Sequence, residues 1–445
     1  MKKRFSIIFQ TTIFIFSSFV SIPAFTQEIL DLKHCLEIGL KQNYDIRIIR
    51  NEQKISDNNY TVGNAGYLPT IDLSAGYSGT SNNIEQKTAT GETVKNNGID
   101  NRTLNAGVNL SWTVFDGFQI QAKYEKLKEL KQMGELNTRL AIEDFISGLT
   151  SEYYNYVRQN IRLANLKYAV SLSKERVRIV EARYNIGSMS RLDLQQARVD
   201  FNADSSNLIK QQEILYSSRI TLNQLMALDN ISQMLIVADS IIIPNSTLKE
   251  VDLCEKTMLY NSLLLVSEKN KRVSELDYKA VKGRNFPYLR VNAGYGYTQN
   301  VYEMGTYDRQ KTMGLNYGIT LGFNIFDGFN RKREQKNAAL QIQNRELQYE
   351  QMELGLKANL ANIWMAYENN LELLSLEKEN LETARENYDI AIERYKLGEL
   401  SGIELREAQN SLLEAEERLL LASYNTKLCE ISLMQISGQI TEYLE

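Results

Sequence analysis

Residues 104–118 read LNAGVNLSWTVFDGF, and residues 313–329 read MGLNYGITLGFNIFDGF. In both stretches apolar residues alternate with small polar ones as far as a shared FDGF motif. A period of two residues is the pattern of a β-strand with one apolar and one polar face. Each stretch therefore predicts a strand that ends at an Asp-Gly turn.

The FDGF motif belongs to an internal duplication that covers almost the whole chain. Phe115 precedes Phe326 by 211 residues, and the same offset relates Leu222 to Leu433. A period of this length indicates a duplicated half-molecule, because solenoid repeats are much shorter. We expect a first repeat over residues 27–228, an equatorial connector over 229–250, a second repeat over 251–438 and a tail over 439–445.

The N-terminus has the pattern of a secretory signal peptide. Three basic residues, Lys2 to Arg4, precede an uncharged run over residues 5–25 that is rich in Ile and Phe. This order is typical of a signal peptide, here residues 1–26, and a retained membrane anchor is the alternative. We therefore expect the mature protein to function outside the cytoplasm.

The composition excludes several classes of function. One His and three Cys among 445 residues are too few for zinc sites built on His and Cys clusters, and they exclude histidine-based catalysis away from His34. A net charge of -4 gives no reason to expect nucleic-acid binding. We expect no enzyme, no metal and no cofactor. A glycosidase that uses only carboxylates is an alternative, but the acidic residues fall on helical faces.

Both repeats have the same order of expected elements. A helix is followed by two alternating strands, a long helix and a return helix, and the presence of only four Pro favours long helices. Asp116 and Asp327 follow the strands and are expected helix N-caps at the barrel junction. The first repeat predicts a helix over 30–65, strands over 70–80 and 103–115, a long helix over 118–185 and a return helix over 191–227. The second predicts a helix over 251–283, strands over 288–298 and 313–325, a long helix over 329–396 and a return helix over 402–436.

The strands have the character of membrane strands. Their polar faces carry Gly, Asn, Ser and Thr with few charges, and aromatic residues cluster at strand ends. These features favour a barrel around a wet lumen over a soluble sheet. Four strands cannot close a barrel, and an open sheet edge cannot lie in lipid, so other copies must complete it. Two copies would give eight strands with a filled interior, and three would give twelve around water. The small polar residues on the inner faces of the strands favour three copies.

The return helices carry a coiled-coil seam. Small and apolar residues recur at alternating steps of three and four, as from Leu194 to Leu222 in the first repeat, where Asp204 and Gln211 interrupt them. The predicted fold class is therefore an α+β membrane protein. A trimeric 12-stranded β-barrel, with four strands per chain, would continue into a long α-helical coiled-coil barrel.

The two hairpins, the FDGF motif, the long helices and the turn RYNIGSMSRLDL at residues 183–194 together resemble the TolC-like outer-membrane factor family. The turn recurs as RYKLGELSGIEL at residues 394–405. The resemblance implies a homotrimeric passive duct through the outer membrane and periplasm, for efflux or type I secretion. It implies a periplasmic membrane-fusion adaptor, an inner-membrane pump of the resistance-nodulation-division or ABC class, and outer-membrane lipid as partners. A trimeric surface adhesin with a 12-stranded anchor is the alternative.

The resemblance also implies roles for residues at the two turns. It implies a periplasmic gate that contains Tyr395, Asp193, Glu404 and Glu407, with a solvated helix face as the alternative for the two glutamates. Leu400 stands where the family has an arginine that binds the aspartate, so we expect other contacts to close this end. Three copies of each carboxylate around one axis would favour cations in the lumen. The implied adaptor-docking tips are Gly187, Ser190, Arg191, Leu192, Gly398, Leu400 and Ser401.

Overall fold

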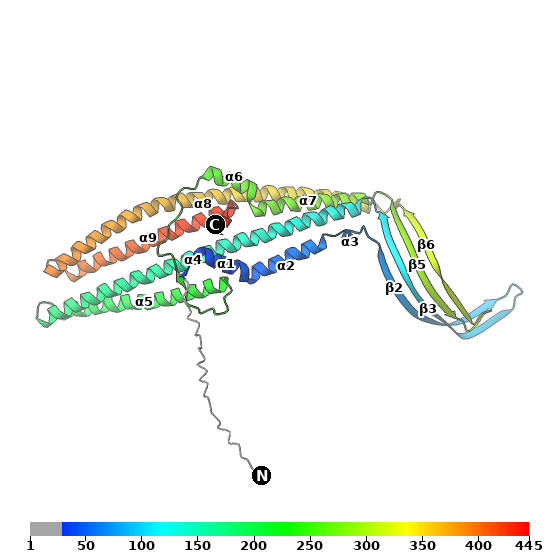
Figure 1. Cartoon of the computed structure of the whole chain (residues 1–445), viewed down its shortest axis with the longest axis horizontal. Coiled ribbons are helices and arrows are strands. Elements are labelled where there is room, and N and C mark those ends of the chain that lie inside the picture. The colour runs from blue at the N-terminus through cyan, green and yellow to red at the C-terminus, as the bar shows by residue number, and fades with distance from the viewer. Residues whose placement is uncertain (1–28, 445) are drawn as a thin grey trace, which may run out of the picture.

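A bundle of long helices continues into a curved sheet at one end of the molecule (Figure 1). The structure is a computed structural model, and it describes residues 29–444. The expected signal peptide, residues 1–26, lies outside the described residues. Within residues 29–444, no helix combines the length and the apolar character that a membrane crossing needs.

Four long strands form one antiparallel sheet in the order β2–β3–β5–β6. In its centre β3 of the first repeat pairs with β5 of the second, with Leu110 opposite Ala293. The two repeats therefore meet in the middle of the sheet, and β2 and β6 each have one unpaired edge in the described chain. The strands are β2 (Thr70–Lys87), β3 (Thr93–Phe115), β5 (Tyr288–Val301) and β6 (Arg309–Gly322).

The first hairpin is longer than the sequence predicted. Its strands were expected over 70–80 and 103–115, but they continue to Lys87 and resume at Thr93 around a short turn. The extension has a polar sequence without regular alternation, so the alternation does not predict it. Its strands pair through backbone hydrogen bonds, which polar residues also make. In the second hairpin the expected strand over 313–325 instead runs from Arg309 to Gly322.

The helices expected before the two hairpins are both interrupted at an asparagine, and the first is interrupted again at Tyr60 and Thr61. Asn43 and Asn261 accept hydrogen bonds from backbone N–H groups of the next helix, and their side-chain amides donate to Leu225 and Ile436 carbonyls at 3.0 and 2.9 Å. Asn is a favoured N-cap, so each break is stabilised. The single helices expected over 30–65 and 251–283 are α1 (Leu32–Gln42), α2 (Tyr44–Asn59), α3 (Val62–Ala65), α6 (Glu250–Tyr260) and α7 (Ser262–Gly283).

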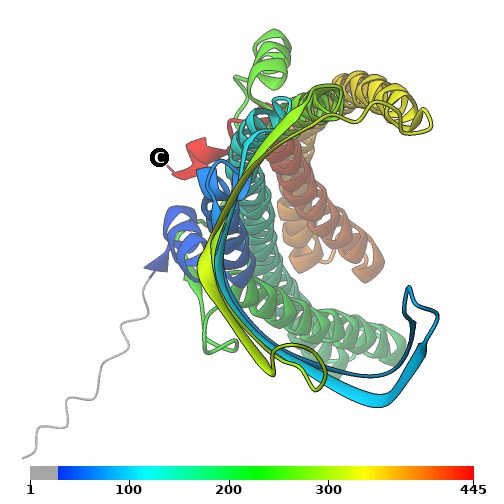
Figure 2. The same ribbon diagram turned by 90° about the vertical axis from the view of Figure 1, so that its right-hand side faces the viewer.

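Two helix pairs form the rest of the molecule. The long helices have 67 and 68 residues, which is roughly 100 Å of helix each. In the half away from the sheet, the helices lie in the order α5–α4–α9–α8. Seen along the long axis, helices and sheet follow one curved wall (Figure 2). The helices are α4 (Gln119–Asn185), α5 (Arg191–Leu225), α8 (Asn330–Leu397) and α9 (Gly402–Ile436).

The largest apolar core lies near the middle of α4, where the connector crosses the helices. Tyr153, fully buried there, donates a hydrogen bond to Asp239 of the connector at 2.8 Å, and Tyr156 donates to the Leu235 carbonyl at 3.1 Å. The short strands β1 (Ile29–Leu30) and β4 (Ile236–Val237) pair beside it, and the 3₁₀ helix Ile440–Leu444 is the last described element.

Candidate functional site

The strand–helix junctions differ from the expected caps. Asp116 and Asp327 do not occupy the N-cap positions, which belong to Phe118 and Phe329 in left-handed conformation. Each aspartate nevertheless accepts a hydrogen bond from the backbone N–H four residues later, at 3.1 and 3.0 Å. Each carboxylate therefore binds a free N–H of the first helical turn, although the aspartate lies two residues before the N-cap. The Gly and Phe after each aspartate are both left-handed, and they turn the chain so that the carboxylate reaches this N–H.

The glycines of the two junctions have different surroundings. Gly117 and Gly328 both have positive φ angles, +73° and +68°. A methyl group added to Gly117 would overlap the Gly283 carbonyl oxygen at the end of α7 and lie 2.9 Å from Phe286, whereas the nearest atom at Gly328 is 3.7 Å away. The first junction is thus packed against α7, and the second is open within the described chain.

Each helix-turn tip is built on a capping box. Ser190 accepts the backbone N–H of Asp193 at 3.2 Å, and the Asp193 carboxylate accepts the Ser190 N–H at 3.1 Å. Ser401 and Glu404 repeat this arrangement at 3.3 and 2.9 Å. The serine hydroxyl in each box holds the pKa of its carboxyl below the ordinary value. Asp193 and Glu404, two of the three expected gate carboxylates, are therefore ionised at neutral pH and bonded within their own turns.

The expected gate tyrosine, Tyr395, is buried inside the chain itself. Its ring has no exposed surface, and it packs in an apolar cluster with Leu194, Leu405 and other seam residues. The Arg183 guanidinium lies 5.2 Å from its ring centroid and donates to its backbone carbonyl at 3.1 Å. Burial raises the pKa of Tyr395, and its hydroxyl has no hydrogen-bond partner among the described residues.

The two tips share a cavity of about 450 Å³. Of the expected gate, Tyr395, Asp193 and Glu407 line it, whereas Glu404 does not. Of the expected docking residues, Leu192 and Ser401 line it. Gly187, Ser190, Arg191 and Gly398 lie in the exposed turns, and Leu400 is half-buried there. The cavity is also lined by charged residues that the sequence did not predict for the site, Arg176, Asp200 and Arg406.

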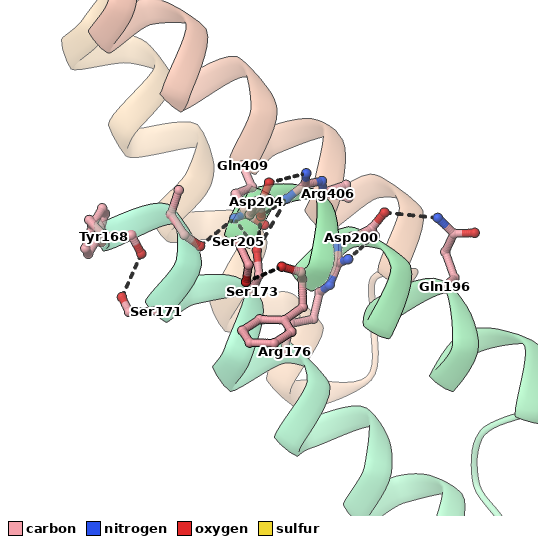
Figure 3. A network of polar contacts seen from close by, with 12 residues as sticks. Tyr168, Ser171, Ser173, Arg176, Gln196, Asp200, Asp204, Ser205, Arg406 and Gln409 are labelled. Carbon is pink, nitrogen blue, oxygen red and sulfur yellow. Dashed lines mark hydrogen bonds and ion pairs between the residues drawn. The ribbon is translucent and has the colours of Figure 1, made fainter. Parts of the chain in front are cut away.

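A network of polar contacts joins α4, α5 and α9 beside this cavity (Figure 3). Arg406 of α9 donates to both carboxylate oxygens of Asp204 of α5, at 2.7 and 2.8 Å. Ser173 of α4 donates to the same carboxylate, and Arg176 of α4 pairs with Asp200 of α5. The network ties the helix pair of the first repeat to a helix of the second, and the Asp204 hydrogen bonds raise the pKa of Arg406.

The sequence contained a signal for this network. Asp204 occupies a coiled-coil seam position at which the second repeat has Ala415. A buried carboxylate needs a partner, so a polar residue in a seam predicts one. The partner itself, Arg406, is 202 residues away in the chain, and only the folded structure identifies it. Within residues 29–444, no group of three His, Cys, Asp or Glu residues is placed to hold a metal ion.

Comparisons with known proteins agree with this architecture. The family model described as outer membrane efflux protein matches residues 36–228 and 255–439. The fold is similar to that of the outer membrane protein VceC of Vibrio cholerae, with a TM-score of 0.73, 16% identity, and coverage of 92% of this chain and 96% of that one. The CmeC outer membrane channel of Campylobacter jejuni has a TM-score of 0.75 and 18% identity, over 92% of this chain and 85% of that one. No curated protein matches the chain in sequence.

Proposed function

Since the chain belongs to the outer membrane efflux protein family, we propose that this outer-membrane protein is a passive homotrimeric duct that exports substrates across the periplasm and the outer membrane. It would serve a tripartite efflux or type I secretion system. An adaptor protein and an inner-membrane pump of the resistance-nodulation-division or ABC class would complete that system. The helical part would extend into the periplasm from a barrel of twelve strands.

The main support for the proposal is the sheet, which has two unpaired edges and exposed apolar side chains. Leu73 on β2 and Tyr317 on β6 are each 82% exposed, and both edges of the sheet are unpaired in the described chain. A sheet with open edges is not stable in lipid, so edge pairing with further copies is required. Pairing of β2 of one copy with β6 of the next would remove every edge and leave the exposed apolar side chains facing hydrocarbon.

The tips support the proposed gate and docking roles. Leu192 is 76% exposed at the end of the helix pair, where an adaptor would have access. We assign docking to both tips, and the gate to Tyr395, Asp193, Glu404 and Glu407. The ionised carboxylates would favour cations at the periplasmic entrance.

Two experiments test the proposed duct. The purified protein should require detergent, migrate as a trimer and form ion-conducting channels in planar bilayers. A detergent-independent soluble monomer would refute the proposal. In cells, a photo-cross-linker at Arg191 or Ser401 should capture the adaptor. The Glu404→Gln/Glu407→Gln variant should conduct with reduced cation selectivity, and unchanged selectivity would remove these residues from the gate.

Surface labelling distinguishes the duct from the adhesin. A duct exposes only the turns of its two hairpins, residues 88–92 and 302–308, outside the cell. An adhesin would expose the helices as well. If a thiol reagent added to intact cells labels a cysteine placed in α5, the result would favour the adhesin.

A further inference from the structure

The helix ends that adjoin the second hairpin are strongly basic. Residues 278–290, from the end of α7 into β5, contain four basic residues and no acidic one. Residues 329–340, at the start of α8, contain four basic residues and one acidic residue. Together the two segments have a net charge of +7, in a chain whose net charge is -4. They are joined in the fold, because Arg331 of α8 donates to the Arg284 carbonyl just after α7 at 3.2 Å.

Four exposed lysines account for most of this charge. None of them forms an ion pair within residues 29–444, whereas the neighbouring Arg284 and Arg331 both have carboxylate partners. Like charges without partners repel one another, so a group of them on a surface predicts an anionic partner. We call these four lysines the basic face: Lys279, Lys282, Lys332 and Lys336.

The two lysines of α7 project from the convex side of the wall. Asp277 forms an ion pair with α4, and Lys271 forms one with α8. At about 100° per residue these two directions are about 120° apart, and Lys279 and Lys282 fall in the wider sector between them. In a curved wall the wider sector between two neighbouring helices is the convex one (Figure 2). It is the outside of the proposed ring.

The two lysines of α8 project from the same side. Arg331 faces α7, and Lys332 and Lys336 lie about 100° and 140° further around the helix. The chain runs toward the sheet in α7 and away from it in α8 (Figure 1). With these opposite directions, the rotation from Arg331 to Lys332 leads to the side from which Lys279 projects. The four charges therefore form one outward surface.

The basic face lies directly below the sheet. Phe286, Phe326 and Phe329, between the strands and the helices, are 48 to 70% exposed. In a membrane barrel, aromatic side chains at this position mark the boundary between hydrocarbon and headgroups. Lys332 and Lys336 follow Phe329 by three and seven residues, roughly 5 and 10 Å along the helix. Their side chains would therefore lie at the phosphate layer of the periplasmic leaflet.

We propose that the basic face binds anionic phospholipid of the periplasmic leaflet, with the lysine ammonium groups on the headgroup phosphates. The inference rests on the proposed barrel, because only a sheet within the membrane brings these lysines to the headgroups. A headgroup with a net negative charge, such as that of phosphatidylglycerol, complements the surface. The amine of zwitterionic phosphatidylethanolamine would instead lie among like charges. The exposed phenylalanine rings favour a lipid over free phosphate, because they offer contact to acyl chains.

Lipid binding to the purified protein tests the basic face. Delipidated full-length protein in a neutral detergent would be titrated with phosphatidylglycerol or phosphatidylethanolamine, and native mass spectrometry would count the lipids bound to each trimer. Phosphatidylglycerol should bind more tightly, and added salt should weaken it. Lys282→Gln/Lys332→Gln should weaken phosphatidylglycerol binding about 25-fold, because each lysine near an anionic lipid surface contributes about fivefold.

The matched control removes two lysines far from the sheet. Lys210 of α5 and Lys378 of α8 are also exposed, and Lys378 lies roughly 70 Å along α8 from its start. Lys210→Gln/Lys378→Gln should therefore bind phosphatidylglycerol as the unmodified protein does. Equal losses in the two double variants would overturn the proposal, because the effect would then reflect total charge.

Two other outcomes would also overturn the lipid site. Equal affinity for the two phospholipids would exclude recognition of the negative headgroup. Displacement of phosphatidylglycerol by an equal concentration of inorganic phosphate would show a phosphate site without a lipid component. Failure of the duct is distinguishable: a conducting trimer that binds phosphatidylglycerol no better than phosphatidylethanolamine refutes only the lipid site, whereas a soluble monomer refutes the duct and the lipid site together.

Discussion

Removal of the Asp204 carboxylate should loosen the contact between the two repeats near the tips. In the Asp204→Ala variant, Arg406 loses both charge-assisted hydrogen bonds, at 2.7 and 2.8 Å, and remains at the cavity that Arg176 and Asp200 also line. Loss of one partner from a fully buried ion pair costs about 3–5 kcal/mol. Because the Arg406 side chain is 20% exposed, we expect a smaller loss, about 2 kcal/mol.

Hydrogen exchange measures this loss directly, because local opening of a helix sets the exchange rate of its amides. A loss of about 2 kcal/mol corresponds to roughly 30-fold faster exchange in the parts of α5 and α9 that surround the network. The control is Glu181→Ala, which removes an ion pair to Arg198 whose two side chains are 48 and 47% exposed. Exposed pairs contribute about 0–1 kcal/mol, so exchange should change less than about fivefold.

A double-mutant cycle separates the ion pair from general loosening. Arg406→Met removes the buried charge, so Asp204→Ala/Arg406→Met should lose at least about 1 kcal/mol less than the two single losses combined. The physical reason is that each single variant leaves an uncompensated charge, which the double variant lacks. Additive losses, or an Asp204→Ala effect no larger than that of Glu181→Ala, would refute the view that the network ties the repeats together.

Three further outcomes follow from the local geometry. Gly117→Ala should lower the yield of folded protein strongly, because Gly117 is packed against α7. Gly328→Ala should lower the free energy of unfolding by only about 1 kcal/mol, because Gly328 has open surroundings. Equal yields of the two detergent-purified variants would contradict this. Ser401→Ala should destabilise the tip by about 1 kcal/mol through loss of the N-cap, visible as faster hydrogen exchange at the start of α9 while the α5 tip is unchanged. Glu416 is half-buried, one of its oxygens has no hydrogen-bond partner among the described residues, and burial raises its pKa above 4.5. Ionisation of Glu416 therefore lowers stability as pH rises above 4.5, so Glu416→Gln should raise the melting temperature at pH 8 and not at pH 4; a gain of equal size at both pH values would exclude the titration.

The sequence by itself predicted the four long strands, the long and return helices, and their order. Strict alternation before each FDGF motif predicted the strands, since a period of two reports a strand whose faces differ. The shared offset of 211 residues from the FDGF motif onward predicted the duplication. The absence of Pro over long stretches predicted the long helices. All of these are local properties, which a segment carries in its own residues.

Only the tertiary structure decided which segments meet. The breaks at Asn43 and Asn261 depend on carbonyl groups at the ends of α5 and α9, and apolar periodicity continues across each break without reporting it. The Asp204–Arg406 pair joins residues far apart in the chain, and a seam pattern predicts that a helix has a partner without saying which. The longer first hairpin follows the same rule, because a ladder of backbone hydrogen bonds needs a neighbouring strand and no particular side chain.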